Sequence, residues 1–148
     1  MPDDRSEQSL RLTIELVPAT SWGANLRDVL PRTEWDRLRR QVYAASGRRC
    51  AVCGAGGRLH AHELWDYDDA RHIQRLRGLV ALCTRCHHVK HLGHARVLAE
   101  RGELDYEDVV AHFLRVNGCD RATFERHRAA AFARFAERSR YEWQIELE

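Results

Sequence analysis

Two pairs of cysteines constrain this sequence more than any other feature. Cys50 and Cys53 form the first pair, Cys83 and Cys86 form the second, and two residues separate the cysteines of each pair. Two cysteines at this spacing can bind one zinc ion with bonds of about 2.3 Å, and two such pairs complete a tetrahedral shell. A shell of four thiolates has no open position, so it shapes a fold without activating water. We therefore expect these four cysteines to hold a structural Zn²⁺ ion.

The composition agrees with a metal site in a reducing compartment. The chain has 148 residues, of which 44% are hydrophobic, as expected for one compact domain. It has no apolar run of about 18 residues, which a membrane span needs, and it does not begin with a secretory signal pattern. We therefore expect a cytoplasmic protein that does not associate with a membrane. In the cytoplasm, paired cysteines favour metal binding over disulfides.

The positive charge gathers around the cysteine pairs. Residues 32–58 carry seven arginines against two acids, and residues 71–101 carry six arginines and one lysine against one acid. Residues 63–69, in contrast, hold four acids and no base. Such a distribution favours a polyanionic partner, namely nucleic acid and in particular DNA. The alternative is that the 23 arginines form ordinary solvated faces. The candidate phosphate contacts are Arg48, Arg49, Arg75, Arg77 and Lys90.

Hydrophobic patterning predicts the elements at the two ends of the chain. Residues 10–17 and 141–147 alternate apolar and polar side chains, which is typical of half-buried strands, and we expect the two strands to pair. Residues 1–9 are polar and are expected to form a disordered tail. A helix should begin near Thr33 and end near Gly47.

The middle and the C-terminal part of the chain predict a small metal core followed by helices. Short strands are expected at 58–62 and 78–82, and a helix should begin near Thr84 and end near Gly93. Helices capped by Asp105 and Asp120 should follow. The sequence thus predicts an α+β fold in a single domain over residues 10–148. Its parts are an N-terminal strand and helix at 10–47, a metal core at 48–94, and C-terminal helices and a strand at 95–148.

Seven of the nine histidines lie within the predicted metal core. On a helix, His87 and His91 are four residues apart, so both imidazoles can bind one ion. On a strand, His60 and His62 share one face, whereas Glu63 lies on the other. We expect a break or a bulge between His62 and Glu63 that brings both side chains into one site, because Glu63 begins an acidic turn.

Three segments of the metal core carry a resemblance to a known family. They are Cys50-x-x-Cys53, Leu59-His60-Ala61-His62-Glu63-Leu64, and Gly78-Leu79-Val80-Ala81-Leu82-Cys83-x-x-Cys86-His87-x-x-x-His91. In order and spacing they resemble the zinc-containing branch of the HNH endonuclease superfamily. The resemblance implies a ββα-metal core, a β-hairpin followed by a helix, held by the four-cysteine zinc site. It also implies a second divalent cation (Mg²⁺, Mn²⁺, Ni²⁺ or Zn²⁺) bound by His62, His87 and His91.

The sequence departs from the family pattern at the position of the catalytic base. The family has a base histidine where this chain has Glu63, and an orienting asparagine where it has Gly78. The resemblance leaves two assignments open. Either Glu63 is the base and His62 a metal ligand, or His62 is the base with His60 or Asp66 as ligand. Two functions follow: a metal-dependent endonuclease that hydrolyses phosphodiester bonds of DNA, or an inactive zinc-stabilised module that binds nucleic acid or protein.

Overall fold

The computed structural model describes residues 9–147 and shows an α+β fold. Within these residues it has one three-stranded sheet, six α-helices, a 3₁₀ turn at Ala19–Ser21 (η1) and a cluster of four cysteines. The predicted fold class is therefore confirmed. The described residues form two compact units, one of residues 17–84 with 135–147 and one of residues 9–16 with 85–134. We call them the hairpin unit and the helical unit. The tail expected at 1–9 falls, except for Ser9, outside the described residues.

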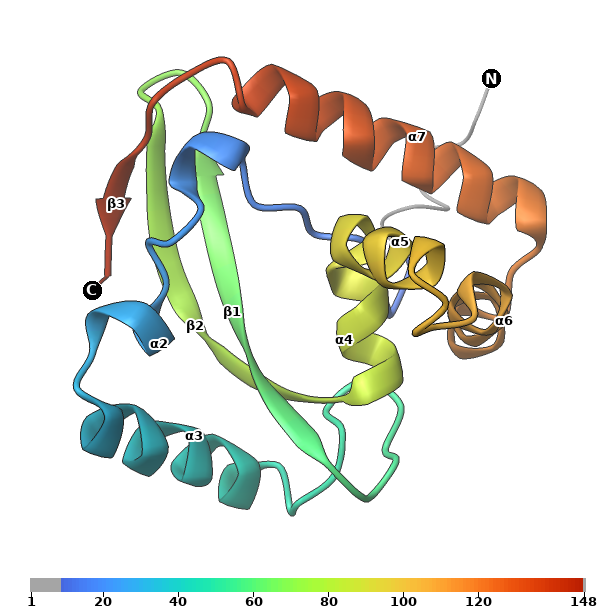
Figure 1. Cartoon of the computed structure of the whole chain (residues 1–148), viewed down its shortest axis with the longest axis horizontal. Helices are drawn as coiled ribbons and strands as arrows, with labels where there is room; N and C mark the ends of the chain where they lie inside the picture. Colours follow the sequence, from blue (N-terminus) through green and yellow to red (C-terminus); the bar gives the residue numbers. More distant parts are fainter. Residues whose placement is uncertain (1–8, 148) are drawn as a thin grey trace. The chain divides into compact units, whose positions relative to one another are not determined.

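A long β-hairpin organises the hairpin unit. Strands β1 (Leu59–Asp68) and β2 (Ile73–Cys83) are antiparallel, and the short strand β3 (Gln144–Glu146) pairs with β2 in parallel (Figure 1). Both hairpin strands extend well beyond the predicted ranges. The predicted C-terminal strand is present, but its partner is β2 and not the N-terminal segment.

Two helices precede the hairpin. The single-turn helix α2 (Leu26–Val29) is capped by Asn25, whose side chain accepts a hydrogen bond from the backbone of Asp28. Helix α3 (Arg32–Ala45) starts after Pro31, so the predicted cap Thr33 lies inside the helix. Helix α3 contacts both β1 and β2 and lies beside the hairpin in Figure 1.

Four helices follow the hairpin along the chain. They are α4 (Thr84–Lys90), α5 (Leu92–Glu100), α6 (Tyr106–Asn117) and α7 (Arg121–Arg138). As predicted, Asp105 caps α6 by accepting the backbone N–H of Glu107, and Asp120 accepts the backbone N–H of Thr123 at the start of α7. The helix expected to end at Gly93 ends at Lys90 instead.

The core of the helical unit is aromatic and aliphatic. Phe113 of α6 and Phe124 of α7 are fully buried, and their rings meet edge to face with centroids 5.1 Å apart. Val89 of α4 and Leu92 of α5 are equally buried. Because Val89 belongs to the core, α4 is anchored in the interior of this unit.

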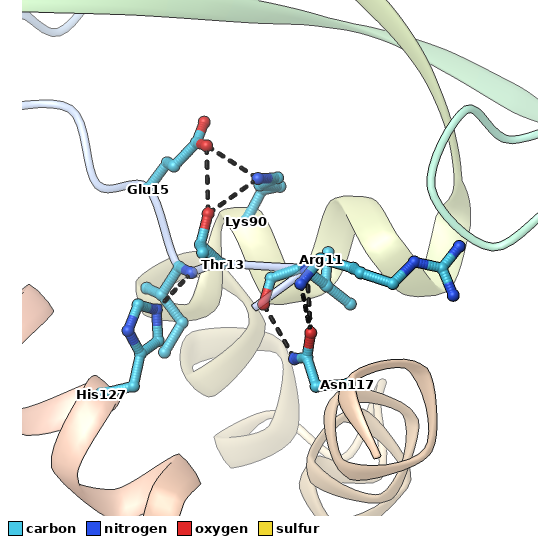
Figure 2. A network of polar contacts seen from close by, with 8 residues as sticks. Arg11, Thr13, Glu15, Lys90, Asn117 and His127 are labelled. Carbon is cyan, nitrogen blue, oxygen red and sulfur yellow. Dashed lines mark hydrogen bonds and ion pairs between the residues drawn. The ribbon is translucent and has the colours of Figure 1, made fainter. Parts of the chain in front are cut away.

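The strand predicted at residues 10–17 is absent. Its backbone groups bond to side chains of distant helices (Figure 2) and, at Glu15, to the backbone carbonyl of Lys90, instead of to a neighbouring strand. Asn117 at the end of α6 accepts the N–H groups of Arg11 and Leu12 and donates to the carbonyl of Leu12. His127 of α7 accepts the N–H of Ile14. These side chains pair backbone groups that a neighbouring strand would otherwise pair.

Candidate metal centres

The four-cysteine cluster has a donor set that fits zinc. One sulfur atom from each of Cys50, Cys53, Cys83 and Cys86 lies within 4.8 Å of the others. The Sγ atoms of Cys53 and Cys83 are 3.6 Å apart. Four ligands at about 2.3 Å from one ion would lie about 3.8 Å apart, whereas a disulfide needs about 2.05 Å. All the described cysteines are free of disulfides. This cluster could therefore hold a metal ion, as the cysteine spacing predicts.

Local backbone structure presents the first cysteine pair. The N–H of Cys50 donates to the carbonyl of Ala55, and the N–H of Gly54 donates back to the carbonyl of Cys50. Gly54 has a φ of 77°, a left-handed conformation that glycine adopts without strain. The N–H of Ala51 donates to the carbonyl of Ala81, which fastens this turn to β2.

The second cysteine pair lies at the junction of β2 and α4. Cys83 is the last residue of β2, and Cys86 lies within the first turn of α4. Both are buried, Cys86 completely. The change from strand to helix directly after Cys83 lets two cysteines three positions apart face the same point.

Cys86 also contacts a histidine that the sequence analysis did not single out. The Nε2 atom of His112 on α6 lies 3.2 Å from the Sγ atom of Cys86, and its Nδ1 atom lies 3.2 Å from Nη2 of Arg115. Burial lowers the pKa of His112, and the positive charges of Arg115 and Arg85 lower it further. Its place on the apolar face of a predicted helix was the only available signal, and that signal indicates burial, not its partner.

Three histidines form a second group of possible metal ligands. One ring nitrogen from each of His62, His87 and His91 lies within 4.8 Å of the others. His62 on β1 is buried, and His87 and His91 are half-buried, with ring centroids 4.6 Å apart. Three imidazoles resemble the protein ligands of a catalytic metal site, which leaves a position for water or substrate. The assignment of these histidines to a bound cation stays a prediction.

The break expected between His62 and Glu63 is absent, so that prediction is wrong. His62 pairs with Val80 and Glu63 with Leu79 in unbroken register, and the irregularity comes only after Leu64. Successive side chains of a continuous strand point to opposite faces, which separates Glu63 from His62. The register shift falls between Leu64 and Trp65, where β2 carries one additional residue, Arg77. Strand β1 is therefore continuous at Glu63.

Glu63 lies in an environment of its own on the other face. Its carboxylate accepts a hydrogen bond from the backbone of Leu26, at the start of α2. Burial raises the pKa of Glu63 to about 7, and the negative charge of Asp28 acts in the same direction. This pKa would suit a general base, but the side chain lies on the wrong face to act beside His62.

The remaining ligand candidates, His60 and Asp66, have other partners. Nε2 of His60 lies 3.0 Å from Oγ1 of Thr84. Asp66 is exposed and forms an ion pair of 3.4 Å with Arg77. Within residues 9–147, the histidine group contains neither of them.

The candidate phosphate contacts differ in their availability. Four of them, Arg48, Arg49, Arg75 and Arg77, are exposed. Lys90 is only 6% exposed, and its ammonium group donates to Glu15 and to Thr13 (Figure 2). Lys90 is thus buried and paired within the protein, and its assignment as a phosphate contact stays a prediction.

Comparisons with known proteins add no family or fold assignment. No protein-family model matches the chain, and searches of curated proteins and of solved structures find no significant similarity. Among residues 9–147, no helix is long and apolar enough to cross a membrane. The case for a function therefore depends on the two ligand groups and their surroundings.

Proposed function

We propose that this protein is a metal-dependent endonuclease of the HNH type, which hydrolyses phosphodiester bonds of DNA. The observation that supports the proposal is the group formed by His62, His87 and His91. His62 comes from β1 and His87 from α4, and His91 directly follows α4. The second cysteine pair lies at the junction of β2 and α4. The arrangement corresponds to the hairpin and helix that the family resemblance implies.

The three histidines supply the metal half of the chemistry. A divalent ion bound there would polarise the phosphate and stabilise the leaving oxygen. His87 and His91 are four residues apart, and His62 would supply the third nitrogen. Neutral imidazoles leave the overall charge of such a site positive, which favours a phosphate diester.

The proton acceptor is the part of the mechanism that differs from the family. Glu63 lies on the opposite face of β1, and Gly78 has no side chain to orient a base. His60 shares the face of His62 and is half-buried. We therefore assign His60 the role of accepting a proton from the attacking water, with Thr84 holding its ring.

Exposed arginines would position the DNA backbone. Arg48 and Arg49 precede the first cysteine pair. Arg75 and Arg77 lie on β2 and form ion pairs with Glu146 and Asp66, respectively. Exposed ion pairs contribute little free energy, so phosphate can replace these carboxylates at small cost. Such contacts hold the duplex without reading its sequence.

Cleavage of supercoiled plasmid tests the proposal. The purified chain is incubated with Mg²⁺, Mn²⁺, Ni²⁺ or Zn²⁺, and nicked and linear products are measured on gels. We expect nicking with at least one metal and its loss in the double variant His62→Ala, His87→Ala. His94→Ala is the matched control, because exposed His94 lies outside the histidine group. Absence of nicking with every metal, or equal nicking by the double variant, would exclude the nuclease.

A zinc-stabilised binding module without catalysis is the second candidate. It is favoured by the position of Glu63, which faces away from the histidine group. Metal analysis separates the two functions. The binding module requires one zinc per chain, no second ion at the histidines, and salt-dependent DNA binding without cleavage.

A further inference from the structure

Two polar residues on α6, buried His112 and exposed Arg115, extend from Cys86 of the four-cysteine cluster. His112 is 5% exposed, and its ring lies between the sulfur of Cys86 and the guanidinium of Arg115. The two contacts use different ring nitrogens, each at 3.2 Å. All three residues belong to the helical unit. Neither the family resemblance nor the proposed nuclease mechanism assigns a role to His112 or Arg115.

The chemistry of arginine decides which ring nitrogen carries the proton. A guanidinium group can only donate hydrogen bonds, so Nδ1 of His112 must accept from Arg115. A neutral imidazole with an accepting Nδ1 carries its hydrogen on Nε2. That N–H faces Sγ of Cys86. A metal-bound thiolate has no hydrogen, so it can accept a hydrogen bond but cannot donate one.

We propose that His112 is an outer-shell member of the four-cysteine metal centre, where it donates a hydrogen bond to the thiolate of Cys86. Arg115 is a positioning residue that fixes the tautomer of His112. Four thiolates around one zinc ion carry an excess negative charge, and a donated N–H spreads that charge. The bond therefore strengthens metal retention, lowers the reactivity of Cys86, and ties α6 to the metal centre. The inference depends on the cysteine cluster alone and not on DNA cleavage.

The chain contains its own contrast to this arrangement. His127 of α7 is also buried, at 6% exposure, but its Nε2 atom accepts the backbone N–H of Ile14. The two buried histidines thus have opposite roles at the same ring atom. His127→Leu creates a similar loss of a buried imidazole without removing a donor to sulfur, so it controls for general destabilisation.

Zinc affinity measured by competition with a chromogenic chelator tests the proposal. We expect His112→Leu to bind zinc about 10- to 100-fold more weakly, as is typical when an outer-shell partner is removed. His112→Gln should stay within about threefold of the wild type, because its amide nitrogen can occupy the position of Nε2. Arg115→Leu should fall between them, and His127→Leu should leave zinc affinity unchanged.

One spectroscopic and one chemical measurement distinguish a hydrogen bond to Cys86 from simple packing of the His112 ring. In the Co²⁺-substituted protein, His112→Leu should shift the thiolate-to-metal charge-transfer band, whereas His127→Leu should not. In the zinc-loaded protein, mass spectrometry after iodoacetamide treatment should show faster alkylation of Cys86 in His112→Leu than in His112→Gln.

Three outcomes would overturn the proposal. One is zinc affinity of His112→Leu within twofold of the wild type. Another is an equal loss of affinity in His112→Gln and His112→Leu, which would indicate ring packing. The third is an unshifted charge-transfer band in His112→Leu. If His112→Leu does not fold with zinc, Arg115→Leu and His112→Gln decide the question, and equal zinc affinity of these two variants would count against the proposal.

Discussion

The two groups of metal-ligand side chains differ in the way they are built. The cysteine cluster offers four sulfurs, three of which belong to buried residues, and it can close a tetrahedral shell. The histidine group offers three nitrogens, and two of its members are only half-buried. A closed shell stabilises a fold, whereas an open set of ligands leaves room for water or substrate. Stability and activity should therefore respond separately to changes in the two groups.

Loss of the cysteine centre should have the largest effect. A structural zinc site contributes on the order of 10 kcal/mol of apparent binding free energy, which is also folding free energy. We expect Cys53→Ser, or a strong chelator, to abolish the cooperative thermal transition followed by circular dichroism. Cys119→Ser is the matched control, because Cys119 lies outside the cluster. An unchanged transition of the wild type in chelator would contradict a structural metal at the cysteines.

Loss of one histidine should remove activity and spare the fold. His91→Ala is expected to lower the plasmid nicking rate by about 100-fold or more, because a catalytic metal supplies several kcal/mol of transition-state stabilisation. The zinc content and the thermal transition should stay close to those of the wild type, because His91 is half-buried and outside the cysteine cluster. A collapse of the thermal transition in His91→Ala would show that the histidine group is structural as well.

A support that uses no metal should have a smaller effect on stability. Asn117 makes three hydrogen bonds with the backbone of residues 11 and 12. At about 0.5 to 1.5 kcal/mol each, their loss in Asn117→Ala should lower the free energy of unfolding by about 1.5 to 4.5 kcal/mol in urea titrations. Asn117→Asp keeps the accepting oxygen and should lower the free energy of unfolding by less than Asn117→Ala. Zinc affinity should not change, in contrast with the substitutions at His112 on the same helix.

The sequence predicted those parts of the molecule that depend on short-range spacing. The cysteine pairs, the histidines four positions apart and the helix caps at Asp105 and Asp120 all lie within a few residues of their partners. Residues 10–17 and 141–147 show the same alternation, yet only the second forms a strand. The difference arises because Asn117 and His127, distant in sequence, satisfy the backbone of the first segment.

The surroundings of Lys90 and of His112 depend on long-range contacts. Lys90 is the only lysine and lies in the basic segment 71–101, which suggested a phosphate contact. Its burial against Glu15 depends on where the N-terminal segment passes. His112 meets Cys86 only after α6 packs against α4. Strand alternation alone predicts that Glu63 faces away from His62, as the register shows. The added expectation of a break placed Glu63 on the same face as His62, which is wrong.

Glu63→Gln should have the smallest effect on cleavage and decides which face of the hairpin carries the chemistry. The carboxylate of Glu63 meets the backbone of Leu26 on the face opposite to His62, so its neutral isostere should change nicking by less than about threefold. His60→Ala should reduce nicking by about 100-fold, within the usual range for a proton acceptor. Single-turnover cleavage assays with saturating metal measure both. A large loss in Glu63→Gln with little loss in His60→Ala would return the base role to Glu63 and require β1 to rearrange when DNA binds.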